Sequence, residues 1–199
     1  LLPLSANSLQ AERMAAQAEA ALPLKKRTWQ VLVRAKIAAQ ATLLEELRCG
    51  DHGLRALLPH VHSGDSENVE AQASRRYWPV LFEQPEFRRE RAAEDQNRNL
   101  NYGYAVLRAI TTRAICASGL HPGLGLHHHN RYDAFCLADD LMEPFRPLVE
   151  REVALWVRGR GREASFDRDA KAALLTPITG RYLFGGESRT LFDWLARMC

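Results

Sequence analysis

Residues 119–147 gather the side-chain types that bind metal ions. Three histidines stand in a row at positions 127–129, and the carboxylates of Asp140 and Glu143 follow them. The spacing of Asp140 and Glu143 places both carboxylates on one face of a helix, whereas three successive histidines cannot all face the same way. Oxygen donors with imidazole and no thiolate favour Mg²⁺ or Mn²⁺ over zinc. The pattern therefore indicates a candidate divalent-metal site.

A structural explanation of the same residues stays open. The histidines can form a solvated loop, and the acidic residues at 139, 140 and 143 can interact with the dipole of a helix N-terminus. Spacing alone favours this explanation. A metal site would also need a third ligand, which the pattern does not choose among Glu67, Glu70, Glu83 and Glu94. A phosphate loop is excluded, because no Lys-Ser or Lys-Thr follows the glycines at 123 and 125.

The elements that would position these residues are mainly helices. Apolar residues recur at helical spacing, and prolines and glycines mark the ends. We expect helices at 8–21, 27–48, 54–58, 66–78 (capped by Asp65 or Ser66), 87–118, 137–156 (broken at Pro144 or Pro147), 168–175 and 190–198, and a short hairpin within 178–187. The fold class is therefore mainly α, which excludes a doubly wound dinucleotide-binding fold.

Two of these helices have notable residues. One side of the helix at 27–48 carries Trp29, Leu32, Val33, Lys36, Ile37, Gln40 and Leu44. The helix at 87–118 contains Gly103, and a glycine inside a helix typically permits close packing or a bend. Its predicted end is Gly119, as expected of a C-terminal glycine.

The composition is that of an ordinary globular protein. The chain has 199 residues with 46% hydrophobic content, enough for one sizeable core. Charged residues interrupt its apolar runs and its first twenty residues are no secretory signal, so we expect a cytoplasmic protein without a membrane span. The four cysteines are widely separated, which is typical of reduced structural cysteines. We interpret residues 1–199 as one helical domain with a short N-terminal remnant at 1–7.

Basic residues are clustered although the net charge is only +3. The clusters lie at 25–27, 75–76, 88–91 and 158–162. Such clusters can line a nucleic-acid groove whatever the overall charge, although each one alone is more often a solvated helix face.

Five blocks of the sequence together resemble a known family. They are LPLSANSLQAERMAAQ, KKRTWQVLVRAKIAAQATLL, ENVEAQASRRYWPVLF, NLNYGYAVLRAI and SGLHPGLGLHHHNRYDAFCLADDLMEPFRP. In this order they are similar to the helical domain of the CRISPR-associated endonuclease and integrase that inserts new spacers, in its type II form. The resemblance covers nearly the whole chain. It implies that the family's β-rich, dimer-forming N-terminal domain is largely missing from this chain.

The resemblance also implies a set of site residues. Glu70 of the VEAQASRRYW block, His128 of the LGxxH element and Glu143 of the DLMEPFRP block would bind the metal ion. Asp140 matches an acidic position close to the metal and takes a supporting catalytic role. The other two histidines of the row become neighbours rather than ligands. Three residues of the N…LNYGY element would pack and orient the site: Asn97, Asn101 and Tyr102.

The implied reaction is the attack of the 3′-hydroxyl of a short DNA duplex on a phosphodiester at the repeat, assisted by Mg²⁺ or Mn²⁺. The implied partners are double-stranded DNA (spacer precursor and repeat target), a second copy in a homodimer and the small dimeric adaptation subunit. Phosphate contacts are expected from Arg75, Arg76, Arg88, Arg89 and Arg91. Two alternatives stay open: a metal-dependent nuclease that cuts branched or single-stranded DNA, and a non-catalytic helical DNA-binding or scaffold subunit.

Overall fold

The computed structural model describes residues 9–161, 166–184 and 186–199. They are mainly helical, with one two-stranded antiparallel sheet, as the sequence predicts. The predicted remnant at 1–7 lies outside the described residues. The elements are α1 (Gln10–Ala18), α2 (Leu22–Arg48), η1 (Arg55–His60), η2 (Ser63–Asp65), α3 (Val69–Phe82), α4 (Asn97–Ala117), α5 (Cys136–Leu141), η3 (Glu143–Phe145), α6 (Arg146–Arg160), α7 (Arg168–Ile178), β1 (Arg181–Phe184), β2 (Glu187–Thr190) and α8 (Leu191–Met198).

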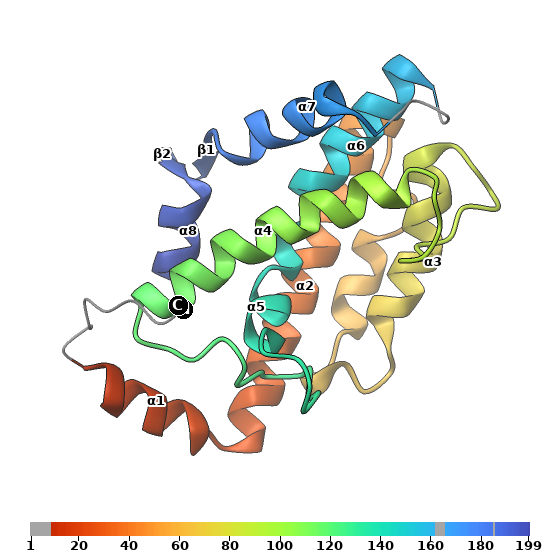
Figure 1. The fold of residues 1–199 in the computed structure, drawn as a ribbon. Coiled ribbons are helices and arrows are strands. Elements are labelled where there is room, and N and C mark those ends of the chain that lie inside the picture. The colour runs from red at the N-terminus through yellow and green to blue at the C-terminus, as the bar shows by residue number, and fades with distance from the viewer. Residues whose placement is uncertain (1–8, 162–165, 185) are drawn as a thin grey trace.

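The long helix α2 is the element on which the site is assembled. It contacts α3, α5, α6 and the short η helices, and Figure 1 shows it crossing the molecule beneath α4 and α6. Its buried side carries Trp29, Val33, Ile37 and Leu44, each at most 1% exposed. The same side buries Lys36. Helical spacing therefore places a cationic side chain among core residues.

Helices α4 and α6 approach closely at Gly103. A Cβ added to Gly103 would clash with Cγ1 of Val149 on α6, so the expectation that this glycine permits close packing is confirmed. At its other end, α4 stops at Gly119, whose positive φ of 80° is a conformation that glycine adopts at low cost. The amide of Leu120 then donates to the carbonyl of Ile115. Both glycines thus set where α4 packs and ends.

The predicted helical start at residue 87 is wrong, because α4 begins only at Asn97. The buried amide side chain of Asn97 explains this. Its Nδ2 donates to the carbonyl of Arg88, and its Oδ1 accepts from the amide of Glu90. The backbone before α4 is thereby satisfied by a side chain instead of by helical hydrogen bonds.

The remaining helix boundaries follow local chemistry. Asp65 accepts hydrogen bonds from the amides of Val69 and Glu70 at 2.9 and 3.0 Å and so stabilises the first turn of α3, as predicted. The helix itself begins at Val69, with Asn68 as its N-cap residue, three residues later than predicted. The predicted break near Pro144 separates α5 from α6. The hairpin pairs Arg181 with Thr190. All four cysteines are free, and none of the described helices combines the length and apolar character of a membrane span.

Candidate metal centre

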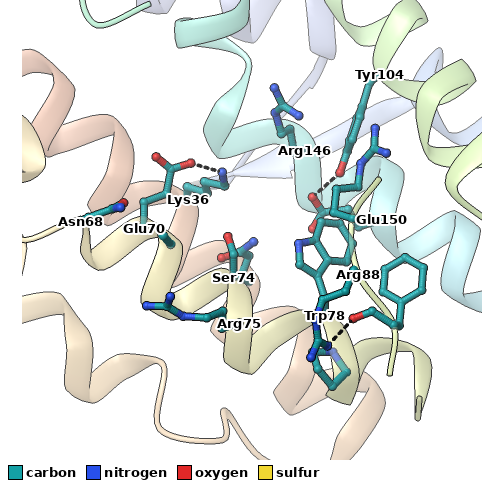
Figure 2. Close-up of a pocket in the computed structure, with 15 residues that line it drawn as sticks. Lys36, Asn68, Glu70, Ser74, Arg75, Trp78, Arg88, Tyr104, Arg146 and Glu150 are labelled. Atoms are coloured by element: carbon teal, nitrogen blue, oxygen red, sulfur yellow. Dashed lines mark hydrogen bonds and ion pairs between the residues drawn. The ribbon is translucent and has the colours of Figure 1, made fainter. Parts of the chain in front are cut away.

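Glu70 of α3 and Glu143 of η3 converge on the ammonium group of Lys36, which projects from α2. Lys36 Nζ lies 2.5 Å from Glu70 Oε1 and 2.6 Å from Glu143 Oε2. Figure 2 shows the Glu70 and Lys36 side chains pointing toward each other. Asp65 holds the first turn of α3 and so fixes the backbone that presents Glu70. Three segments that are distant in the sequence thus meet around one positive charge.

Glu143 is ionised although it is only 3% exposed. Burial alone would raise its pKa, but the charges of Lys36 and Arg146 outweigh burial and hold the pKa below its usual range. Arg146 Nη2 lies 2.8 Å from Glu143 Oε1. Glu143 Oε2 is buried and lies 2.6 Å from Lys36 Nζ, so the ammonium group is the counter-charge of this oxygen.

The charge of Lys36 depends on the two carboxylates. Burial alone would lower the pKa of its ammonium group, but Glu143 and Glu70 outweigh burial and raise it. Lys36 is therefore a buried cation held by two anions. Removing either carboxylate would leave the buried ammonium group with a single counter-charge.

His128 is oriented by Asp140. The carboxylate of Asp140 is fully buried and accepts hydrogen bonds from the backbone amides of Leu126, His127 and His128. Asp140 Oδ1 also lies 2.6 Å from His128 Nδ1. Because this carboxylate can only accept, we assign the imidazole proton to Nδ1, which leaves the lone pair on Nε2. The hydrogen bond with Asp140 is the main reason that the pKa of His128 is raised.

The loop that carries His128 closes because of Gly125. A Cβ at Gly125 would overlap the carbonyl oxygen of His128 and press against Cys136 and Asp140. The neighbouring His127 stacks on Trp29, with ring centroids 4.2 Å apart and an interplanar angle of 3°. The ring of His127 therefore packs against the core residue Trp29. Its predicted role as a neighbour rather than a ligand stays a prediction, and so does that of His129.

The donor chemistry of the three predicted ligands fits a divalent ion. Glu70 and Glu143 already contact one cation, the ammonium group of Lys36. The charges of His128 and Glu143 affect each other's pKa. Nε2 of His128 carries a lone pair that can bind a metal ion. However, in the part of the chain that the structure describes, no three His, Cys, Asp or Glu side chains have the geometry to hold a metal ion. The ammonium group of Lys36 lies between the carboxylates. A bound ion would replace it as their counter-charge.

A second buried carboxylate ties together the helices around this centre. Glu150 of α6 is 0% exposed and accepts hydrogen bonds from the hydroxyl groups of Tyr77 on α3, at 2.5 Å, and Tyr104 on α4, at 2.7 Å. Figure 2 shows Tyr104 and Glu150 facing each other. Burial raises the pKa of Glu150 and raises those of both tyrosines well above their usual range. This cluster, the Glu150 tie, fixes α3 relative to the start of α6.

Comparison with known proteins identifies the family of the chain. Residues 4–184 match the family described as CRISPR associated protein Cas1. The chain belongs to the Cas1 family. It is 43% identical over 141 residues to the CRISPR-associated endonuclease Cas1 of Neisseria meningitidis serogroup C, and this alignment covers 69% of the chain and 46% of the relative. The chain thus spans about half the length of that Cas1 protein.

Solved structures confirm the Cas1 fold. The chain is similar to casposase bound to integration product, with a TM-score of 0.79 and 20% identity, over 96% of this chain and 67% of that chain. It is also similar to a chain of a partial Cas6-RT-Cas1–Cas2 complex, with a TM-score of 0.72 and 19% identity, over 94% and 68% of the two chains. The resemblance seen in the sequence blocks is therefore confirmed at the level of family and fold.

Of the four acidic residues considered for the third ligand of this Cas1 chain, Glu70 is the one that contacts the same ammonium group as Glu143. Glu67 lies 3.5 Å from His62, and Glu83 lies 3.4 Å from Arg48. The structure therefore brings Glu70 to Glu143, and it brings Asp140 to His128. The metal-binding role of these residues stays a prediction.

The five predicted DNA-binding arginines of the Cas1 chain divide between different environments. Four of them line two adjoining cavities. Arg75, Arg88 and Arg89 line a cavity of about 500 Å³ that also contains Glu70, here called the Glu70 cavity, while Arg89 and Arg91 line its neighbour. Arg76 lies outside both cavities and donates to the carbonyl of Gly53 at 3.2 Å. DNA contact by these residues stays a prediction.

Sequence reasoning missed the roles of Lys36, Arg146 and Glu150. Each carries a charge on a helix whose neighbouring positions are apolar and buried. For Lys36 and Glu150, a charged residue on the core side of a helix was a usable signal, because such residues are rarely buried unless they are paired. Of the three residues predicted to orient the site, Asn97 and Asn101 bind Arg89. The ring of Tyr102 instead packs edge-on against Phe166.

Proposed function

We propose that this Cas1-family protein is a divalent-metal-dependent DNA endonuclease and integrase that inserts short DNA fragments into a CRISPR array. The observation that carries the proposal is the convergence of Glu70 and Glu143, from separate helices, on one buried cation. The imidazole of His128 is held by Asp140, and its charge interacts with that of Glu143. Carboxylates gathered in this way are suited to a divalent ion, and the fold around them is that of Cas1.

The names of similar proteins support the same proposal. The Neisseria relative is named an endonuclease. The casposase of similar fold is bound to an integration product. Hydrolysis and integration at a phosphodiester differ only in the nucleophile, which is water in one and a DNA 3′-hydroxyl in the other. One site can therefore serve both reactions.

Glu70, His128 and Glu143 would hold Mg²⁺ or Mn²⁺. When bound, the ion would lower the pKa of the attacking hydroxyl, offset negative charge at phosphorus and stabilise the leaving oxygen. The two carboxylates would cancel the charge of the divalent ion, and the neutral imidazole adds no charge. The site would therefore not repel the DNA backbone. Asp140 keeps the proton of His128 on Nδ1, which leaves the lone pair of Nε2 available to a metal ion.

The residues of the chain bind and orient the reacting groups. Arg146, beside Glu143, supplies a fixed positive charge near the phosphate. Lys36 balances the carboxylates before the ion is present. In the exchange, a bond forms between the attacking 3′-oxygen and phosphorus, and the bond between phosphorus and the 3′-oxygen of the repeat breaks. The attacking hydroxyl gives its proton to solvent, and the released 3′-oxygen takes up one proton to become a free hydroxyl. The number of phosphodiester bonds is unchanged, so no high-energy cofactor is needed.

The proposed partners are double-stranded DNA, a second copy of the protein in a homodimer, and a small dimeric adaptation subunit. DNA is supported by the casposase complex, and the subunit by the Cas1–Cas2 complexes of similar fold. A dimer is proposed from family resemblance.

An integration assay tests the proposal. A supercoiled target and a duplex with free 3′-hydroxyl ends are incubated with Mn²⁺, and joined products are counted. Glu70→Gln, His128→Ala and Glu143→Gln should each lower integration by about a hundredfold or more, because each removes a donor from the ion. Glu83→Gln is the control, since Glu83 is an exposed carboxylate away from the centre. Full activity of any ligand variant would remove that residue from the site.

A non-catalytic scaffold or DNA-binding subunit is the alternative that one observation favours. The described residues lack a ready three-donor metal cluster, and Lys36 already satisfies the two carboxylates as a structural ion pair would. Calorimetric titration with Mn²⁺ separates the two. A scaffold binds no ion and is indifferent to Glu70→Gln, whereas the proposed enzyme loses metal binding in that variant.

A further inference from the structure

Gln40 of α2 carries a buried amide group that no other described residue satisfies. The residue is only 1% exposed, and neither its Nε2 nor its Oε1 has a hydrogen-bond partner in the described part of the chain. A buried polar atom without a partner is unfavourable, and a primary amide offers both donors and an acceptor. Two unmet atoms on one buried side chain point to a partner that binds there in another state of the protein.

Gln40 lies beside Lys36 in the wall of the Glu70 cavity. Both side chains line this cavity, together with Glu150, and Figure 2 shows Lys36 and Glu150 along it. Gln40 follows Lys36 by four residues on α2, and residues at this spacing are neighbours on the surface of a helix. The ammonium group of Lys36 is therefore a donor within side-chain reach of an acceptor that has none.

A divalent ion and Lys36 need the same two carboxylates. Lys36 Nζ lies 2.5 Å from Glu70 Oε1 and 2.6 Å from Glu143 Oε2. An ion held by both carboxylates would come so close to the ammonium group that the two cations repel each other. The four-carbon stem of lysine is flexible, so the ammonium group can move while the backbone of α2 stays in place. In its new position this buried group needs new polar partners.

Glu150 contributes negative charge on the same side of the cavity. Burial raises the pKa of Glu150, and the charge of Lys36 opposes that rise, so the two groups are close enough to interact. The hydroxyl groups of Tyr77 and Tyr104 hold the carboxyl group of Glu150 in place. A displaced ammonium group would therefore have a fixed electrostatic partner in addition to the amide oxygen of Gln40.

We propose that the ammonium group of Lys36 moves from Glu70 and Glu143 to Oε1 of Gln40 when a divalent ion binds. Without the ion, Lys36 holds the two carboxylates together. With the ion, Gln40 accepts a hydrogen bond from the displaced ammonium group. Gln40 is a positioning residue, because it acts through Lys36 and does not contact the ion. This inference rests on the proposed function, since it requires an ion at the two carboxylates.

A double-mutant cycle on Mn²⁺ affinity tests the proposal. The unchanged protein, Gln40→Met, Lys36→Met and the double variant are titrated with Mn²⁺ in a calorimeter, without DNA. When Lys36 is present, Gln40→Met should weaken Mn²⁺ binding by about tenfold, because the displaced ammonium group loses a hydrogen bond. When Lys36 is replaced by Met, the same change should alter the affinity by less than about twofold.

Stability in EDTA separates this role from a purely structural one. Gln40→Met replaces an unsatisfied amide by an apolar side chain of similar length, so the unfolding midpoint should stay the same or rise. A structural role instead predicts a lower midpoint and weaker Mn²⁺ binding in both backgrounds. Gln30→Met is the matched control on α2, because its amide donates to the carbonyl of Val61 and lies outside the Glu70 cavity. It should leave the Mn²⁺ affinity unchanged.

A crystal structure of the unchanged protein with Mn²⁺ tests the movement without any variant. Anomalous scattering locates the ion, and Lys36 Nζ should lie within hydrogen-bond distance of Gln40 Oε1. The proposal is wrong if an ion binds Glu70 and Glu143 while Lys36 still contacts both of them. It is also wrong if Gln40→Met weakens Mn²⁺ binding equally in both backgrounds or not at all.

These results also distinguish the inference from the proposed function. Mn²⁺ binding that is lost in Glu70→Gln but is indifferent to Gln40→Met refutes the movement of Lys36 and leaves the metal centre intact. If the unchanged protein binds no Mn²⁺, the metal centre is refuted, and the inference fails with it.

Discussion

Lys36 lies between two of the residues that we propose as metal ligands. Its ammonium group contacts one oxygen of Glu70 and one of Glu143, while its stem lies among the core residues of α2. A buried lysine stays charged only with anionic partners nearby. The carboxylates and the lysine therefore depend on each other, and a divalent ion would change that balance.

Lys36→Met should make the stability of the protein depend on metal. Without the ammonium group, Glu70 loses its ion-pair partner and Glu143 keeps only Arg146, so we expect a loss of about 3 kcal/mol of unfolding free energy in EDTA. Mn²⁺ should recover much of this loss, because it replaces the missing charge. Urea unfolding with EDTA and with Mn²⁺ measures both values.

Lys25→Met is the control for this change, because Lys25 forms no ion pair in the described part of α2. It should lose little stability and gain nothing specific from Mn²⁺. If Mn²⁺ stabilises Lys36→Met no more than the unchanged protein, the two carboxylates do not share an ion.

Metal binding should weaken as the pH falls through the pKa of His128. A protonated imidazole cannot ligate, and the hydrogen bond with Asp140 raises that pKa above about 6.5, the ordinary value. Glu143 stays ionised over this range, because its pKa is lowered. Below the midpoint, Mn²⁺ affinity should fall by about tenfold per pH unit, as expected for one linked proton.

Calorimetric titration between about pH 5 and pH 8 measures this dependence. His128→Ala should bind Mn²⁺ weakly and lose most of the pH dependence. Constant affinity or a constant integration rate across that range would exclude His128 as a ligand.

At the scale of elements, the Glu150 tie holds the site-bearing helices together. Tyr77 and Tyr104 bring α3 and α4 to one carboxylate on α6. Glu70 lies on α3, two helical turns before Tyr77. Glu143 directly precedes α6. The positions of Glu70 and Glu143 thus depend on a hydrogen bond made elsewhere on the same segment or the next.

Tyr77→Phe should destabilise the protein and weaken its metal site. The change removes one of two hydrogen bonds to a buried carboxyl group and should cost about 1.5–3 kcal/mol of unfolding free energy. Tyr102→Phe is the matched control on α4, because in the described residues its hydroxyl forms no hydrogen bond, and it should cost under about 0.5 kcal/mol. Urea unfolding compares the two, and equal losses would show that the tie contributes nothing.

At the scale of the whole molecule, arginines from two of the four basic clusters, at 75–76 and 88–91, contribute to one cationic region around the two cavities. Arginines from α3, from the segment before α4 and from α4 and α6 line it. The formal net charge of +3 hides this concentration. Such a region attracts the DNA backbone without reading base sequence.

The salt dependence of DNA binding should report these arginines. The logarithm of affinity should fall with the logarithm of salt concentration at about 0.9 per phosphate neutralised, and Arg75→Glu should lower that slope by about one unit. Arg76→Glu is the comparison, because Arg76 lies outside both cavities and contacts the carbonyl of Gly53. Anisotropy titrations at several salt concentrations measure both slopes. An unchanged slope in Arg75→Glu would place the DNA elsewhere.

Local chemistry in the sequence was enough to predict the helical class, the end of α4 at Gly119, the stabilisation of the first turn of α3 by Asp65 and the break near Pro144. These features depend on backbone conformation and nearby hydrogen bonds, which neighbouring residues decide. The start of α4 was not predictable in this way, because Asn97 satisfies a backbone carbonyl nine residues earlier. The family and the candidate metal ligands were predicted from the resemblance of five sequence blocks to a known family.

Only the tertiary structure placed Lys36 between Glu70 and Glu143, joined Glu150 to two tyrosines and gathered four arginines in one cavity. Each of these arrangements joins segments that are far apart in the chain. Their contacts arise from helix packing, which burial of the shared core determines and which no local pattern records. The sequence by itself determined the side chains available to the site, and packing decided which of them meet.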